Sequence, residues 1–232
     1  AGATAKTGSF GRIKNGFYNN IIAEERYDLI LEGLEATLLI AILSILFGTV
    51  LGAFMCWRLL VGKKEIWHGI LKVYGAVMHG VPLLVILMLM FYVVFSSSSI
   101  SAVAVSIVTF SIYFGYASCE IFHTGITGVA KGQVEAARSL GMSRFKAFRY
   151  VVFPQAVRSI VPFYESEAVT LLKETCLVGF IAVVDLTKAT DIIQSRTFDA
   201  FFPLITAAVI YFVLAWLLGL ALGRITKKRP EK

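Results

Sequence analysis

Gly132 to Pro154 reads GQVEAARSLGMSRFKAFRYVVFP, a charged stretch between two long apolar segments. From Gln133 to Leu140, small residues recur at helical spacing, which predicts two turns of helix with a face that a partner's backbone can approach. Gly141 suits a left-handed helix end, and Ser143 suits the N-cap of a second short helix. We expect Pro154 to end that second helix. The stretch is therefore predicted to be a helical insertion that faces water.

The composition of the whole chain indicates a membrane protein. Of 232 residues, 57% are hydrophobic and only 16% are charged, and the mean hydropathy is +0.77. These values are typical of one domain with several membrane spans. The net charge of +7 lies in short basic clusters beside apolar segments, which indicates orientation in a bilayer and not nucleic-acid binding. The three cysteines are isolated from one another, so neither a disulfide framework nor a metal site is predicted.

The spacing within the charged stretch carries a family resemblance. The order Glu135-Ala136-Ala137, three residues, Gly141, nine residues and then VVFP resembles the EAA loop of ATP-binding-cassette (ABC) importer permeases, EAA-x3-G-x9-I-x-L-P. Valine replaces isoleucine and phenylalanine replaces leucine. Three further stretches look like the polar amino-acid uptake branch of these permeases: Lys131 to Gln133, Gly80 to Pro82, and Leu172 to Thr175. The resemblance covers roughly Tyr27 to Arg224.

This resemblance implies an all-α membrane protein with the transmembrane domain of a type I ABC importer. It implies a permease subunit that moves a polar or charged amino acid, with a second copy or paralogue beside it and an extracytoplasmic solute-binding protein or fused domain outside. ATP and Mg²⁺ would be bound by separate ATPase subunits, and none would be bound by this chain. The implied ATPase-docking residues of the coupling helix are Glu135, Ala136, Ala137, Arg138, Leu140 and Gly141.

Five apolar segments of about 20 residues are each long enough to cross a bilayer. They run over Leu34 to Trp57, Val73 to Phe95, Ile100 to Phe122, Ile160 to Val184 and Phe201 to Gly223. Basic clusters follow the first and last segments and fill the coupling stretch, 131–154, which predicts that these regions are cytosolic. The N-terminus would then lie outside and the C-terminus inside a bacterial cytoplasmic membrane. The domain would cover residues 29–224, followed by a basic cytosolic tail, 225–232.

Residues 1–28 are polar and are expected to lie outside the membrane. Phe10, Ile13, Phe17 and Ile21 form an apolar stripe at helical spacing after Ser9, which suits a helix lying along a membrane surface. A linker from an upstream solute-binding module is an equal alternative.

The fourth segment is unusually charged for a membrane span. Four ionised groups near the centre of a bilayer cost about 12 kcal/mol on insertion scales. Insertion of the apolar residues of this segment contributes only roughly 4–7 kcal/mol of favourable free energy. The segment therefore cannot face lipid on all sides. The four groups are Glu165, Glu167, Lys173 and Glu174.

One face of this segment is a candidate cargo path. Glu167, Thr170 and Glu174 share a face with Lys173 beside them, while Glu165 points to the opposite side. Carboxylates and an ammonium group match the two ends of an α-amino acid. Structural ion pairs between helices explain Lys173 and Glu174 equally well.

Other polar and small residues have more modest interpretations. His79 precedes Pro82, which is expected to kink the second span, and is a candidate pore-lining residue or a packed histidine. Glu120 and His123 are expected to hold the coupling stretch. Small residues at every fourth position predict close helix packing; they are Ser44, Gly48, Gly52, Ala215, Gly219 and Gly223.

The sequence contains no phosphate-binding loop and no hydrolase motif, so the chain is not expected to be an enzyme. No catalytic residues and no metal ligands are assigned. The alternative from another class is an ion-coupled secondary transporter or channel that uses the charges of the fourth segment.

Overall fold

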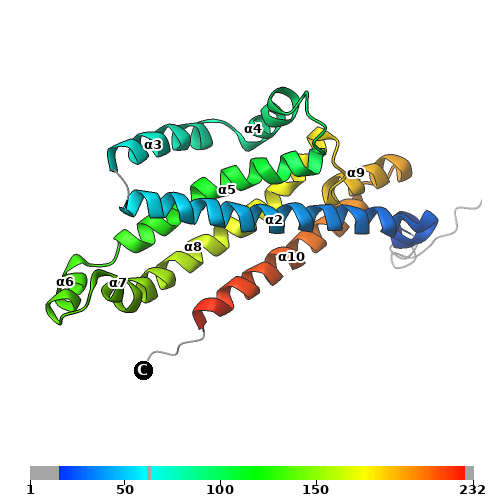
Figure 1. The fold of residues 1–232 in the computed structure, drawn as a ribbon. Coiled ribbons are helices and arrows are strands. Elements are labelled where there is room, and N and C mark those ends of the chain that lie inside the picture. Colours follow the sequence, from blue (N-terminus) through cyan, green and yellow to red (C-terminus); the bar gives the residue numbers. More distant parts are fainter. Residues whose placement is uncertain (1–15, 62–63, 228–232) are drawn as a thin grey trace, which may run out of the picture.

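The computed structural model describes residues 16–61 and 64–227, and within these ranges the chain is helical without β-strands (Figure 1). Phe10 and Ile13 of the expected stripe lie outside these residues, whereas Phe17 and Ile21 lie within them. A π-helical turn, Tyr18–Ile22, and a 3₁₀ turn, Ala23–Glu25, precede the first long helix. The α-helices are α2 Arg26–Val61, α3 Lys64–Gly80, α4 Leu83–Leu89, α5 Ala102–Thr127, α6 Lys131–Ser139, α7 Arg144–Ala147, α8 Phe153–Glu174, α9 Leu186–Thr197 and α10 Phe201–Lys227.

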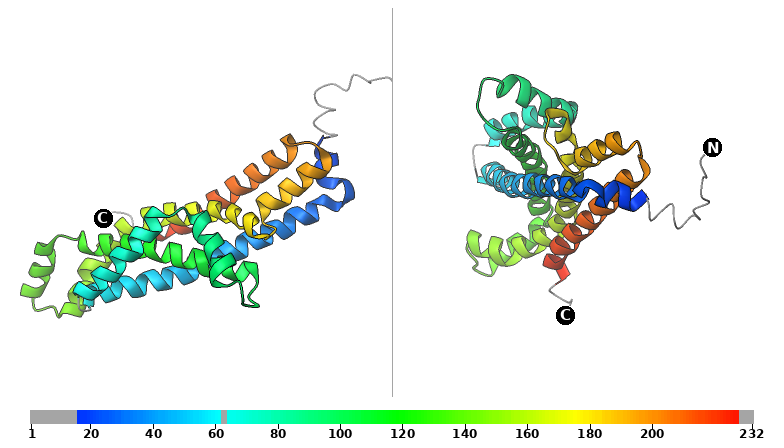
Figure 2. Two further views of the ribbon diagram at one scale, coloured as in Figure 1. Left: turned by 90° about the horizontal axis from the view of Figure 1, so that it is seen from above. Right: turned by 90° about the vertical axis from the view of Figure 1, so that its right-hand side faces the viewer.

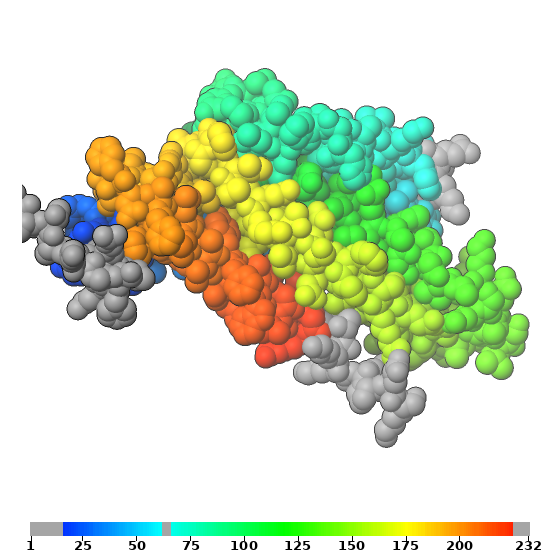
Figure 3. Space-filling view, turned by 180° about the vertical axis from the view of Figure 1, so that it is seen from behind, coloured from blue at the N-terminus to red at the C-terminus, as the bar shows by residue number. Residues whose placement is uncertain are grey.

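The molecule is elongated, with α6 and α7 at one end and α9 at the other (Figures 1 and 2). The central core includes fully buried Phe110 and Phe114 of α5, Ile40 of α2 and Leu171 of α8. Seen from behind, α8 lies between α3–α4 and α10 and presents an open face (Figure 3). The core thus joins α2, α5 and α8, while one side of α8 is left for another surface to cover.

The small residues of α2 pack against α5, as predicted. A Cβ atom built at Gly48 would lie 3.0 Å from the Phe114 side chain and from the Ser111 carbonyl. At Gly52 it would lie 2.6 Å from Ser118 Cβ and 2.7 Å from the Gly115 carbonyl. Only hydrogen atoms at these positions allow the two backbones to approach this closely.

Gly52→Val should destabilise this helix pair. The added groups would meet backbone atoms of α5, which cannot rotate away, and overpacking of this kind costs about 1–3 kcal/mol. For a chain of this size, that corresponds to a fall in Tm of roughly 2–4 °C per kcal/mol. Gly69→Val is the matched control, because a Cβ atom at Gly69 meets nothing within 4 Å. Equal melting temperatures for the two purified variants would contradict the close packing.

The hydropathy of the helices agrees only in part with five spans. Among the described residues, three segments are long and apolar enough to cross a membrane: Tyr18–Val61, Ala102–Thr127 and Phe201–Arg224. Ile66–Gly80 and Leu83–Val94 make a fourth if they are taken together as one bent span. Helix α8 is too charged to meet this criterion, so its membrane crossing stays a prediction.

Two expectations were wrong, one about Pro154 and one about the bounds of the fourth segment. Pro154 does not end a helix; it lies in the first turn of α8, where its missing N–H group leaves no hydrogen bond unmade. A π-helical turn, Phe148–Val152, joins α7 to α8, so the chain is helical from Arg144 onward. The α-helix then ends at Glu174, and 3₁₀ turns cover Thr175–Ile181. The segment is therefore displaced toward the coupling stretch from the predicted Ile160 to Val184.

Candidate functional site

A sharp break between α3 and α4 shapes the candidate cargo site. The chain bends by 106° between Ile66–Gly80 and Leu83–Val94, which confirms the kink expected at Pro82. Pro82 is the N-cap of α4, with a backbone conformation outside the helical region. The break leaves His79 in the last turn of α3, on the α5 side of the bend.

A cavity of about 230 Å³ lies beside this break, between α3, α5 and α8. His79 comes from α3, Glu120 from α5 and Glu167 from α8, so three elements far apart in the sequence each contribute an ionisable group. Apolar and aromatic side chains complete the lining, namely Met78, Tyr113, Tyr116, Ala117 and Ile121. A few polar groups converging in a mainly apolar cavity are typical of small-molecule sites.

Glu120 is held in place by two neighbours. The Tyr116 hydroxyl donates a hydrogen bond to Glu120 Oε1 over 2.7 Å, one turn earlier on α5. His79 Nε2 lies 3.4 Å from Glu120 Oε2, within ion-pair range when the imidazole is protonated. The His79 and Tyr116 rings meet edge to face, with centroids 5.2 Å apart. With Glu167 included, two carboxylates share the cavity with one imidazole, so acidic groups outnumber basic ones in its lining.

The four candidate residues of α8 do not all line the cavity. Glu167 lines the cavity, whereas Thr170, Lys173 and Glu174 do not. Lys173 is exposed, and Glu174 has a buried Oε2 atom without a hydrogen-bond partner among the described residues. The Glu165 carboxylate lies against α10, about 3 Å from where Cβ atoms of Gly219 and Gly223 would be. These small residues of α10 therefore make room for a carboxylate of α8.

Sequence reasoning gave Glu120 a different role and did not single out Tyr113 or Tyr116. Tyr116 and Glu120 are four residues apart, and residues with this spacing on a helix are neighbours on one face. This spacing could have indicated that the two side chains meet. Nothing in the sequence indicated that His79 would reach the same carboxylate from another helix. Among the described residues, no group of three or more His, Cys, Asp and Glu side chains is arranged to hold a metal ion.

Apart from Pro154, the coupling stretch has the local structure that its sequence predicts. Gly141 adopts φ = 82°, in the left-handed region, directly after α6 and the residue that caps it. The Ser143 side chain accepts a hydrogen bond from the Lys146 N–H and caps α7. The Gln155 amide of α8 donates to Gln133 Oε1 of α6 over 2.5 Å. This bond ties the coupling stretch directly to the helix that carries Glu167.

Five of the six docking candidates are exposed, and the sixth, Ala137, is turned inward with 5% of its surface exposed. Leu140 is 82% exposed, and Phe145 nearby is 75% exposed. Two large apolar side chains at this end of the molecule are thus uncovered. Such a surface fits a protein partner, since exposed apolar groups cluster at interaction sites.

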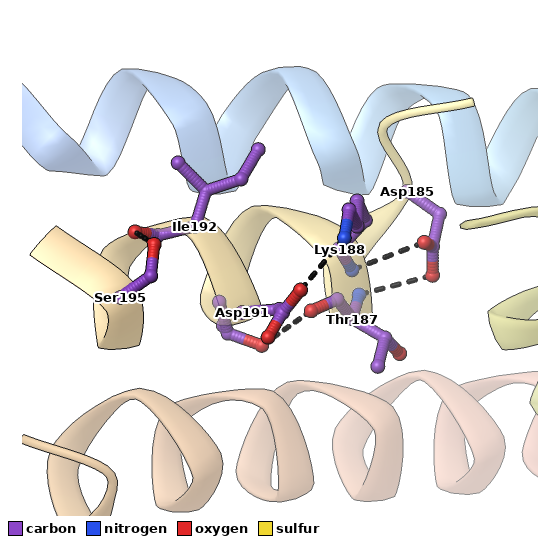
Figure 4. A network of polar contacts seen from close by, with 7 residues as sticks. Asp185, Thr187, Lys188, Asp191, Ile192 and Ser195 are labelled. Atoms are coloured by element: carbon purple, nitrogen blue, oxygen red, sulfur yellow. Dashed lines mark hydrogen bonds and ion pairs between the residues drawn. The ribbon is translucent and has the colours of Figure 1, made fainter. Parts of the chain in front are cut away.

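At the opposite end, α9 packs between α2 and α10 and is fixed by its N-cap, Asp185 (Figure 4). The fully buried carboxylate accepts hydrogen bonds from the Thr187 and Lys188 N–H groups, over 3.0 and 3.1 Å, and from the Tyr211 hydroxyl. Burial raises the pKa of Asp185 above its ordinary value, and these donors oppose the shift. The Leu186 N–H donates to Thr37 of α2. The segment that connects α8 to α10 therefore contains a helix, α9, with one face buried against its neighbours.

Asp185→Ala should therefore loosen α9 and leave the long helices in place. Loss of an N-cap costs about 0.5–2 kcal/mol, and the buried donors would lose their acceptor as well. Hydrogen exchange is expected to speed up in Leu186–Thr197 while α5 stays protected. Asp191→Ala is the control, because Asp191 is exposed and pairs only with Lys188 at 2.7 Å. Unchanged exchange in α9 would show that the cap is dispensable.

Long apolar helices around a cavity with three ionisable groups, together with a helical stretch facing water at one end, define an integral membrane protein of the transport class. A family model described as binding-protein-dependent transport system inner membrane component matches residues 44–230. The chain belongs to this family. It is therefore a membrane component of a transport system and not an enzyme.

Similar proteins carry related descriptions. A putative glutamine transport system permease protein of Rickettsia felis is 31% identical over 204 residues, which cover 86% of this chain and 92% of that protein. A probable amino-acid ABC transporter permease protein of Bacillus subtilis is 31% identical over 212 residues, 91% and 93% of the two chains. A crystal structure of an amino acid ABC transporter with histidines matches with a TM-score of 0.76 and 33% identity, over 88% of this chain and 95% of that one.

A methionine ABC transporter in an inward-facing conformation has the same fold, with a TM-score of 0.72 at 19% identity over 88% of this chain and 98% of that one.

Proposed function

We propose that the chain is the permease subunit of an ATP-driven importer that carries a polar or charged amino acid across the bacterial cytoplasmic membrane. The relatives described as glutamine and amino-acid permeases support this class of cargo. The observation that carries the proposal is the direct link between the coupling stretch and the cavity: Gln133 is bonded to Gln155 of α8, and the same helix presents Glu167 to the cavity.

In this proposal, the cavity receives the charged part of the cargo. The carboxylates of Glu120 and Glu167 attract an ammonium group, either the α-ammonium or a cationic side chain. The imidazole of His79 offers an N–H group to the cargo carboxylate when the cargo displaces Glu120 from it. Lys173, Thr170 and Glu174 lie on the same helix outside the cavity, where they would meet cargo or a second subunit.

The energy comes from partners outside this chain. Two ATPase subunits would bind ATP and Mg²⁺ and dock on the exposed residues of the coupling stretch. Their closure would move α6, and through the Gln133–Gln155 bond the start of α8 would follow. Alternating access then arises from differential binding of partners and cargo to two arrangements of the helices.

The assembly would place a second copy or a paralogue against the open face of α8 and a solute-binding protein, or a fused module, at the α9 end. The positive clusters beside the apolar segments support a cytosolic coupling stretch and C-terminus and an N-terminus outside. The membrane itself covers the exposed apolar faces of α2 and α10.

Gentle extraction of the chain from its native membrane tests the proposal, with the accompanying proteins identified by mass spectrometry. We expect an ATPase subunit with the parent chain and its loss from a variant carrying Glu135→Lys and Gly141→Trp. The extracted assembly is then placed in vesicles with labelled glutamine, histidine or arginine, where uptake should require ATP. Uptake driven by an ion gradient without ATP would instead favour the ion-coupled alternative.

A further inference from the structure

A second cavity, of about 320 Å³, lies away from the cargo site, at the end of the bundle that carries the coupling stretch. It is enclosed by the last turns of α2, the last turns of α5 and the start of α8. Its lining includes Trp57, Phe122, Ile126, Phe153, Val157 and Ile160, and no charged or hydroxyl side chain of the described residues lines it. We call it the acyl cavity.

The dimensions of the acyl cavity suit part of a hydrocarbon chain. At roughly 30 Å³ for each small group, the share of one water molecule in the liquid, it holds about ten methylene groups. Moving a water molecule into such a space is not favourable, because the water finds no hydrogen-bond partners there. Two aromatic side chains of the lining, Trp57 and Phe153, are also about half exposed and reach the surface of the molecule.

Two guanidinium groups stand at these aromatic rings. Arg58 Cζ lies 5.8 Å from the centroid of the Trp57 ring and 4.9 Å from that of Trp67. Arg149 Cζ lies 5.9 Å from the centroid of the Phe153 ring. Neither arginine forms an ion pair within the described residues, and Arg58 Nε is buried without a hydrogen-bond partner there. The rim of the acyl cavity therefore carries unneutralised positive charge.

An apolar interior with a cationic rim matches one chemical class, an anionic lipid. Tryptophan and arginine at helix ends are typical of the boundary between hydrocarbon and headgroups. Basic pockets between helices at this depth bind acidic headgroups. We propose that the acyl cavity holds one chain of an anionic phospholipid, with its phosphate between Arg58 and Arg149. The bound lipid would fill the space between α2 and α8 at the end of the bundle that carries the coupling stretch.

With the coupling stretch in the cytosol, as proposed above, the bound lipid would belong to the cytosolic leaflet, whereas the site itself does not depend on the transport function. Binding is therefore measured directly, on the assembly as it is extracted. Native mass spectrometry would follow titration of the delipidated assembly with phosphatidylglycerol or phosphatidylcholine of identical acyl chains. We expect one phosphatidylglycerol per chain to be retained in preference to phosphatidylcholine.

Two kinds of variant separate the parts of the site. Arg58→Gln and Arg149→Gln should each lower the preference for phosphatidylglycerol about fivefold. Arg158→Gln, on the exposed surface of α8, is the matched control and should leave it unchanged. Ala53→Phe, which fills the acyl cavity, should abolish retention of either lipid, whereas Val50→Phe, one turn away on the exposed surface of α2, should not.

Equal retention of both lipids by the parent chain would overturn the proposal, as would full retention by Ala53→Phe. Loss of the bound lipid on addition of inorganic phosphate alone would show a headgroup site without an acyl cavity and would overturn it too. If Ala53→Phe fails to fold, the two arginine variants and their control decide the result.

Discussion

Glu167→Gln should lower ATP-dependent amino-acid uptake by about 10- to 100-fold, because a hydrogen bond to a charged group contributes about 1.5–3 kcal/mol and each 1.4 kcal/mol is tenfold. The glutamine keeps the size of the side chain and removes the negative charge that would attract the cargo ammonium. The measurement is initial uptake of labelled amino acid into vesicles, divided by the amount of assembled complex.

Glu165→Gln is the matched control for this experiment. It makes the same chemical change two residues earlier on α8, where the carboxylate lies against Gly219 and Gly223 of α10 and outside the cavity. We expect uptake close to that of the parent chain. Equal losses in the two variants would mean that negative charge on α8 matters only for assembly, and the cargo path would have to be sought elsewhere.

Gly141→Val should release the ATPase subunits from the membrane domain. A β-branched residue at φ = 82° costs roughly 1–2 kcal/mol, so the turn after α6 would adopt another conformation. Leu140 and Phe145 lie on either side of that turn and would no longer present one surface. Retention of the ATPase subunit during extraction is expected to fall about tenfold for a loss of 1.4 kcal/mol in docking.

Two other variants show whether the backbone conformation is the cause. Gly132→Val introduces the same side chain at the start of α6, where a Cβ atom meets nothing within 4 Å and φ is not positive. It should retain the ATPase subunit. Gly141→Asn should restore much of the docking, because asparagine tolerates the left-handed region. Loss of the ATPase subunit from Gly132→Val as well would show that any bulk in this stretch prevents docking.

Features that depend on neighbours in the sequence could be predicted. The left-handed Gly141, the Ser143 cap and the break at Pro82 are local, and each was confirmed. The packing of Gly48 and Gly52 followed from their spacing of four residues. Pro154 was misinterpreted because a proline marks either the end of one helix or the first turn of the next, and the π-helical turn before it has no sequence signal.

The candidate cavity could be predicted only in part, since its residues meet through tertiary packing. Charge on an apolar segment singled out Glu167, but the partner side chains come from α3 and α5. His79 reaches Glu120 only because α3 stops at the break and lies against α5. The end of α8 at Glu174 was also missed, because apolar residues continue through the 3₁₀ turns and hydropathy does not distinguish the two kinds of helix.

Helix α2 contacts α9 in one half and the start of α8 in the other, so it links the two ends of the molecule. At 1.5 Å per residue, its 36 residues extend over about 54 Å. Thr37, in the half of α2 nearer its start, is bonded to the first residue of α9, while Trp57 near its other end lies beside the start of α8. A rotation of about 5° around the midpoint would move Trp57 by roughly 2 Å and Thr37 by roughly 1 Å, in opposite directions. The close packing of Gly48 and Gly52 against α5 would resist bending of α2, so a displacement near the start of α8 would reach α9.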